Sequence, residues 1–205
     1  MTYLLITLLV VLILPLLTAS WRLSLVGLGL QGLLMTALVA QRGWNISTGS
    51  VLLLLDLLVL RTWFVPRHLF SIMREMGGPL RRDVIPANLL SWTMAGALVL
   101  VGFRFAAVLH PEGGVVATHV AVATSGLLLG LLVLATQAST FGQIIGLLRV
   151  EYAIALFELA AGAEPGLPVQ LGVTAVLFLS VLTLGAFLRK LGAAGPDRPA
   201  RERPA

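Results

Sequence analysis

Apolar residues fill long, almost uninterrupted runs of the chain, and short polar or glycine- and proline-rich stretches separate these runs. A run of about 20 apolar residues is long enough to cross the hydrocarbon core of a bilayer as an α-helix. The pattern predicts an all-α, polytopic bundle of about seven transmembrane helices over residues 1–191. The predicted helices lie near Thr2–Ala19, Leu23–Ala40, Gly49–Met73, Ala87–Leu109, Val115–Ala135, Phe141–Ala163 and Pro168–Leu191.

Several boundaries carry local signals. Pro66 predicts that the third helix ends or kinks there, because proline interrupts the helical hydrogen-bond ladder. The following segment, RHLFSIMREM, is predicted to lie at the membrane interface as a short amphipathic helix. The first run lacks the positive start of a signal peptide, so we interpret it as a retained helix. Residues 192–205 are rich in Gly, Pro and charge, which predicts a disordered cytoplasmic tail.

The composition supports a membrane protein and excludes several kinds of site. Of the 205 residues, 58% are hydrophobic and 11% are charged, and the mean hydropathy is +0.99. Soluble domains have about a quarter charged residues. The chain has no cysteine, which excludes disulfides and thiolate-bound metal or iron–sulfur centres. The net charge of +5 does not predict a nucleic-acid partner, because the basic residues are spread over short loops and the tail.

Basic residues are concentrated on one side of the predicted bundle. The loop from Arg67 to Pro86 contains four arginines, the last residues contain Arg189, Lys190 and three further arginines, and Arg22 falls on the same side. The opposite side has Arg42, Glu112 and Glu164. The positive-inside rule therefore predicts an N-terminus outside and a C-terminus in the cytoplasm.

Two glycine pairs have the spacing that lets membrane helices approach closely. GLLLG runs from Gly126 to Gly130, and GQIIG runs from Gly142 to Gly146. Small residues four positions apart form a flat face against a neighbouring helix. The alternative is that these glycines only reflect the general abundance of glycine in membrane helices.

Charged side chains within the predicted helices are the candidate functional residues, because a charge at the bilayer centre costs about 3 kcal/mol on insertion scales. Glu151 and Glu158 are seven residues apart and face the same way on one helix. Arg149 points nearly opposite to Glu151, so each requires partners on other helices or water. The remaining candidates are Asp56 and Arg61 in the third helix and Arg104 near the outer end of the fourth.

These charges have two interpretations. They form a row along a hydrated path that relays protons, or they form structural ion pairs that hold helices together. The histidines do not suggest a metal site, since His119 is alone in its helix without partner ligands. The sequence has no phosphate-binding loop and no nucleophile motif, so the chain itself is not expected to be catalytic.

The order of these features resembles the hydrogenase-4 component E family. The resemblance is carried by SWRLSLVGLGLQGLL, RTWFVP, QIIGLLRVEYAIALFELA and PVQLGVTAVLFLSVLTLGAFLRK, and it covers nearly the whole chain in order. Members of this family are small membrane subunits of group 4 nickel–iron hydrogenase and formate hydrogenlyase complexes. Their C-terminal part, here residues 115–191, is similar to the K-type subunit of respiratory complex I.

The resemblance implies a multi-pass subunit of a bacterial or archaeal inner membrane. Its partners would be antiporter-like and quinone-subunit-like membrane subunits and, indirectly, a soluble redox arm. Iron–sulfur and nickel–iron centres would be bound by partner subunits, with no cofactor in this chain. The resemblance also places Glu151 on a central hydrophilic axis and implies that Arg61, five residues before Pro66, replaces a lysine.

Two departures from the family pattern bear on the mechanism. The last helix of the family brings further acidic residues, whereas the matching positions here are Gln170 and Val176. Arginine in place of lysine at position 61 also removes a readily deprotonated group, since arginine stays charged. Glu158 is a candidate substitute for the absent carboxylate.

Three functions remain open from the sequence. The first is a subunit that anchors the membrane arm of a hydrogenase-like complex and contributes to a proton or ion path. The second is a purely structural assembly subunit, which the absence of carboxylates from the last helix favours. The third is a free-standing small transporter, which would predict broken helices and an internal repeat that the sequence does not display.

Overall fold

The computed structural model describes residues 1–17, 20–41, 48–76, 89–162 and 166–194, and these residues are helical apart from short connections. In chain order the elements are α1 (Thr2–Leu17), α2 (Trp21–Gln41), α3 (Thr48–Leu55), the π-helix η1 (Asp56–Phe64), α4 (Val65–Glu75), α5 (Leu89–Leu109), α6 (Gly114–Thr136), α7 (Thr140–Ala161) and α8 (Leu167–Ala194). Because α3, η1 and α4 follow one another without a break, Thr48–Glu75 is one continuous helix. The all-α prediction is confirmed, and each of the seven predicted runs corresponds to one helix of the described chain.

Five of these helices are long and apolar enough to cross a membrane: α2, Thr48–Glu75, α5, α6 and α8. The other two differ in identifiable ways. Helix α1 is shorter, with 16 residues. Helix α7 has 22 residues but carries three charged side chains, Arg149, Glu151 and Glu158. Three of the six candidate charges therefore lie in α7, and Asp56 and Arg61 lie in the third helix.

The third helix corrects two predictions. It does not end at Pro66 and does not give way to a separate interface helix, since α4 continues in helical geometry to Glu75. A kink at Pro66, the other alternative, stays a prediction. Arg67 and Arg74 are thus helical and not part of a loop. The apolar side of α4, with Leu69 and Ile72, is buried, and α4 packs against α8. This packing stabilises the turns after the proline.

The predicted C-terminal boundary at residue 191 is also too early, because α8 continues to Ala194. The remainder of the predicted tail, residues 195–205, lies outside the described residues. Four residues that entered the prediction of orientation also lie outside the described residues: Arg42, Arg81, Arg82 and Glu164.

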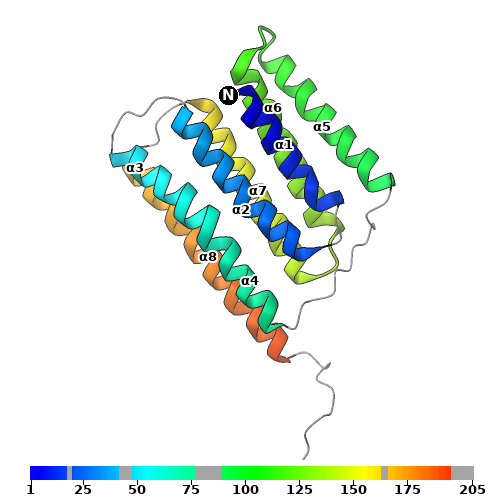
Figure 1. Cartoon of the computed structure of the whole chain (residues 1–205), viewed down its shortest axis with the longest axis vertical. Helices are drawn as coiled ribbons and strands as arrows, with labels where there is room; N and C mark the ends of the chain where they lie inside the picture. The colour runs from blue at the N-terminus through cyan, green and yellow to red at the C-terminus, as the bar shows by residue number, and fades with distance from the viewer. Residues whose placement is uncertain (18–19, 42–47, 77–88, 163–165, 195–205) are drawn as a thin grey trace, which may run out of the picture.

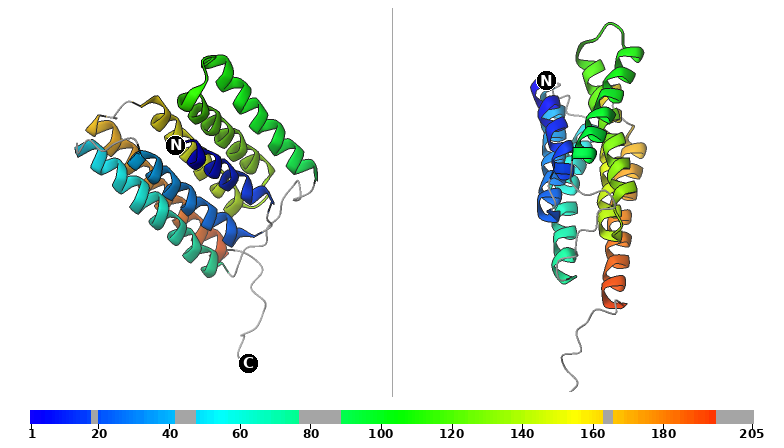
Figure 2. Two further views of the ribbon diagram at one scale, coloured as in Figure 1. Left: turned by 45° about the horizontal axis from the view of Figure 1, so that its top comes forward. Right: turned by 90° about the vertical axis from the view of Figure 1, so that its right-hand side faces the viewer.

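The helices form two layers, with α5 at one edge (Figures 1 and 2). Helices α1, α2 and Thr48–Glu75 make one layer, and α6, α7 and α8 make the other. Across the layers, α1 contacts α6, α2 contacts α7, and the third helix contacts α8. Consecutive helices run in opposite directions, so the start of α2 and the ends of α4 and α8 lie at the same end of the bundle (Figure 1).

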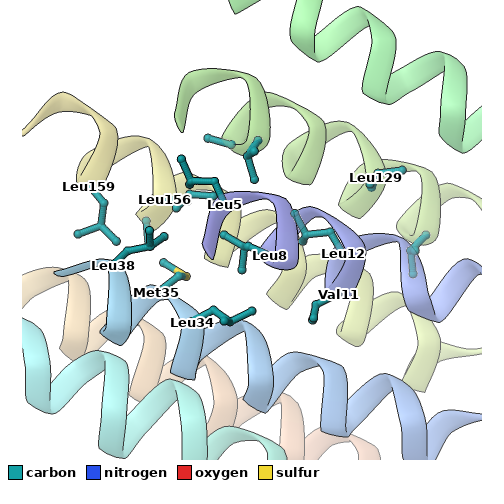
Figure 3. Close-up of a cluster of buried hydrophobic side chains, with 14 of the residues drawn as sticks. Leu5, Leu8, Val11, Leu12, Leu34, Met35, Leu38, Leu129, Leu156 and Leu159 are labelled. Carbon is teal, nitrogen blue, oxygen red and sulfur yellow. The ribbon is translucent and has the colours of Figure 1, made fainter. Parts of the chain in front are cut away.

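Leucine side chains fill the space between the layers (Figure 3). Leu5, Leu8 and Leu12 of α1 are fully buried between α2 and the second layer. They meet Met35 of α2 and Leu156 of α7 in one apolar cluster. This core holds α1 in place although α1 is the shortest of the seven helices.

One glycine of each pair lies where α6 and α7 touch. A Cβ on Gly130 of α6 would come within 2.9 Å of the Val150 backbone nitrogen, and a Cβ on Gly146 of α7 would come within 2.7 Å of the Leu134 nitrogen. The prediction of close helix approach is therefore confirmed for α6 and α7.

Candidate functional site: a buried ion triad

Three of the predicted site residues meet between the two layers. The Arg61 guanidinium donates from Nη1 and Nη2 to the two carboxylate oxygens of Glu151, each at 2.8 Å. Its Nε donates to Oδ2 of Asp56, also at 2.8 Å. The side chains of Arg61 and Asp56 are 1% and 2% exposed, whereas 30% of the Glu151 side chain is exposed. We call these three residues the ion triad.

The bidentate geometry matters because a fork-shaped guanidinium matches a carboxylate with two parallel hydrogen bonds. The pair joins positions 90 residues apart in the chain and links the third helix to α7. Removing one member of a buried ion pair is far more costly than removing all of it, because the remaining charge is uncompensated. The ion triad thus fastens the two layers to each other.

A π-helical register brings Asp56 and Arg61 together. In an α-helix, side chains five residues apart point about 140° away from each other. A backbone hydrogen bond joins residues five apart in η1: the Val65 N–H donates to the Leu60 carbonyl. The Thr62 side-chain hydroxyl likewise donates to a carbonyl five residues earlier, that of Leu57, at 2.8 Å. This wider turn moves Asp56 and Arg61 toward the same side. Segments of π-helix occur frequently at functional sites.

Tyr152 completes the site by satisfying a backbone group that Pro66 leaves without a donor. In the register of η1, the carbonyl of Arg61 would accept from the N–H of residue 66, and proline has none. The Tyr152 hydroxyl donates to this carbonyl at 2.7 Å instead. The centre of the Tyr152 ring also lies 5.0 Å from the Arg61 Cζ, within the range of a cation–π interaction. Helix α7 therefore holds both the backbone and the guanidinium of Arg61.

Tyr152→Phe is expected to lower the free energy of unfolding by about 1–3 kcal/mol, because it leaves the buried Arg61 carbonyl without a donor. The measurement is thermal unfolding of the purified chain in a mild detergent. Tyr3→Phe is the matched control, since Tyr3 is 86% exposed, and it should leave the midpoint unchanged. Equal midpoints for the two variants would contradict the role of the hydroxyl.

Arg149 lies apart from the ion triad, as its position in the helix predicts. Its side chain is buried, and Nη1 donates to the Leu12 carbonyl of α1 at 3.1 Å. Nη2 lies 3.5 Å from where a Cβ on Gly27 of α2 would be. The expectation that Arg149 does not neutralise Glu151 within α7 is therefore confirmed. Arg149 binds α1, whereas Glu151 binds the third helix.

Helix α2 approaches the triad through glycines. A Cβ on Gly32 would come within 2.8 Å of the Thr62 hydroxyl and 3.0 Å of the Arg61 carbonyl carbon. A Cβ on Gly29 would come within 3.0 Å of the Thr62 carbonyl oxygen. These close contacts bring α2 against η1 and cover the side of the π turns that faces α2, whereas Leu58, Val59 and Trp63 of η1 are exposed.

The remaining predicted site residues do not join the triad. Glu158 is exposed on the same face of α7 as Glu151, near the end of the helix. Arg104 is exposed on α5 at the edge of the bundle. On α8, Gln170 is buried, whereas Val176 is exposed. His119, considered and rejected as a metal ligand, is buried with Nδ1 3.1 Å from the Val115 carbonyl oxygen of its own helix.

Sequence reasoning missed Tyr152 and Gln31. Tyr152 stands directly after Glu151, but its role depends on the π register, which neither periodicity nor spacing along the sequence predicts. Gln31 is a lone amide in the apolar stretch GLGLQGLL, and that isolation was the available signal. Its side chain is fully buried, and neither amide atom has a hydrogen-bond partner among the described residues.

Comparisons of the chain with protein-family models, with curated proteins and with solved structures return no match. The resemblance to the hydrogenase-4 component E family therefore stays a prediction from the sequence.

Proposed function

We propose that this chain is a seven-span subunit of a complex I-related, hydrogenase-like oxidoreductase of an inner membrane, with its N-terminus outside and its C-terminus in the cytoplasm. Support for the orientation comes from charge. The start of α2 and the ends of α4 and α8 share one end of the bundle, and these segments carry Arg22, Arg74, Arg189 and Lys190. Basic residues favour the cytoplasmic side.

The ion triad is the observation that supports a role in moving protons. Arg61 is shared by two carboxylates, and one of them, Glu151, is partly exposed. When Glu151 takes up a proton, it loses its charge and its hold on Arg61 weakens, while Asp56 still compensates the guanidinium. Loss of the proton restores the bidentate pair. In this scheme a permanently charged arginine takes part without being deprotonated.

In the assembled complex, the catalytic and redox centres belong to partner subunits. The chain contributes the Glu151 carboxylate to a lateral proton path through the membrane arm and anchors neighbouring membrane subunits. This assignment depends on the family resemblance, which places a glutamate on a central hydrophilic axis at the position of Glu151.

A purely structural role is the second candidate, and two observations favour it. The three members of the triad hold one another through short hydrogen bonds, and the sequence of α8 contains no acidic residue that would extend a path. In that case the triad only joins the third helix to α7.

Glu151→Gln distinguishes the two functions. A tagged chain is purified from native membranes in mild detergent, its partners are identified, and redox-driven proton movement is measured in inverted membrane vesicles. If Glu151 relays protons, coupled proton movement in the assembled variant should fall by about a hundredfold or more, the low end of what one proton-transfer group contributes. Glu112→Gln, at an exposed glutamate between α5 and α6 and outside the triad, should retain it.

Unchanged proton movement in an assembled Glu151→Gln complex would reject the relay and leave the structural role. Purification without antiporter-like or iron–sulfur subunits would reject the oxidoreductase assignment itself.

A further inference from the structure

One face of α7 remains uncovered by the described helices. Gln143, Leu147, Ile154 and Glu158 are exposed, and the partly exposed Glu151 lies between them. Successive members are three or four residues apart, so they form one stripe along the helix. We call these five residues the α7 stripe. Helix α8, the next in the chain, packs mainly on the third helix and touches α7 little.

The α7 stripe is too polar for a surface that faces lipid. It extends about 22 Å along the helix axis, and three of its five side chains are polar or ionisable. Glu151 lies near the middle of α7, which runs from Thr140 to Ala161. Ionisable groups at that depth are costly in lipid and almost always face protein or water.

Within the ion triad, the carboxylates also outnumber the cation. With both carboxylates ionised, the ion triad has two negative groups and one positive group. The nearest buried cation on α7, Arg149, points away from the stripe and donates to Leu12 of α1. Asp56 Oδ1 is buried without a hydrogen-bond partner among the described residues. Of the two carboxylates, Glu151 is the one that reaches the surface of the bundle, with 30% of its side chain exposed against 2% for Asp56. A cation outside the bundle can therefore balance the triad through Glu151.

We propose that the α7 stripe is the docking surface for a transmembrane helix of another subunit, and that this helix carries a lysine or arginine at the depth of Glu151. The proposal rests on the proposed function, because it requires a membrane complex. Leu147 and Ile154 provide the apolar contacts on either side of the charge. A cation at the level of Glu151 would balance the triad within a low-dielectric contact.

A second copy of this chain fits the stripe less well. If two copies faced each other through the α7 stripe, the Glu151 carboxylate of one would lie against that of the other, and the two like charges would repel. Among the described residues, the exposed arginines within the helices lie away from the required depth. Arg67 is six residues, or about 9 Å, from Arg61 along the third helix, and Arg104 is five residues, or about 7.5 Å, from the end of α5.

Site-specific photo-cross-linking in native membranes tests the proposal. The full chain carries p-benzoylphenylalanine in place of Leu147, of Ile154, or of Val101 on α5, a control position that is 53% exposed. We expect the two α7 positions to cross-link to one transmembrane peptide that contains a lysine or arginine. Replacing that basic residue by methionine should reduce the cross-link yield by about tenfold, without changing the yield at Val101.

Cross-links only to lipid, to a second copy of the chain, or to a peptide without a basic side chain would overturn the docking proposal. If redox subunits co-purify but the α7 positions do not cross-link to such a helix, the docking proposal fails and the proposed function stands. If the stripe captures a basic transmembrane helix while no redox subunit co-purifies, docking holds and the oxidoreductase assignment fails.

Discussion

Replacing Arg61 by methionine is expected to lower the free energy of unfolding by about 3–5 kcal/mol, the usual cost of breaking a buried ion pair by removing one partner. The variant leaves Asp56, which is 2% exposed, and Glu151 without their shared cation. It also removes the guanidinium from the Tyr152 ring. Thermal unfolding in mild detergent, together with the amount of chain in the membrane, measures the effect.

Two further variants separate charge from packing. Arg104→Met removes an exposed arginine of α5 and should change stability by no more than about 0.5 kcal/mol. The triple variant Asp56→Asn, Arg61→Met, Glu151→Gln should recover most of the lost stability, because it leaves no buried charge uncompensated. A single Arg61→Met variant as stable as the original chain would contradict the burial of the triad.

Gly146→Ala is expected to separate α6 from α7 and to lower the free energy of unfolding by about 1–3 kcal/mol, as overpacking does. The added Cβ would lie 2.7 Å from the nitrogen and 2.8 Å from the Cα of Leu134. Both are backbone atoms, so no side-chain rotation relieves the contact. The midpoint of thermal unfolding in detergent is again the measurement.

Gly172→Ala is the matched control, because a Cβ there would meet no atom within 4 Å. In a helix this change should be neutral or stabilise by up to about 1 kcal/mol, since alanine has the higher helix propensity. Equal midpoints of thermal unfolding for Gly146→Ala and Gly172→Ala would contradict the close contact between α6 and α7.

The sequence by itself determined where the helices lie and which way their charges point. Long apolar runs predicted all seven helices of the described chain, because an α-helix needs about 20 mostly apolar residues to cross the hydrocarbon core of a bilayer. Helical periodicity was enough to place Arg149 and Glu151 on opposite sides of α7, and to place Glu158 on the side of Glu151. These properties belong to one helix and need no neighbour.

Only the tertiary structure decided which groups meet. Nothing local to residues 56–66 predicted that the third helix would adopt a π register and continue through Pro66. That register is accompanied by two tertiary contacts: Tyr152 donates to the Arg61 carbonyl from 91 residues away, and α2 packs closely against η1 at Gly32. The choice of Arg61 as the partner of Glu151 is likewise a matter of which helices face each other across the two layers. Spacing along a chain fixes the direction of a side chain, but its partner depends on contacts between helices distant in the sequence.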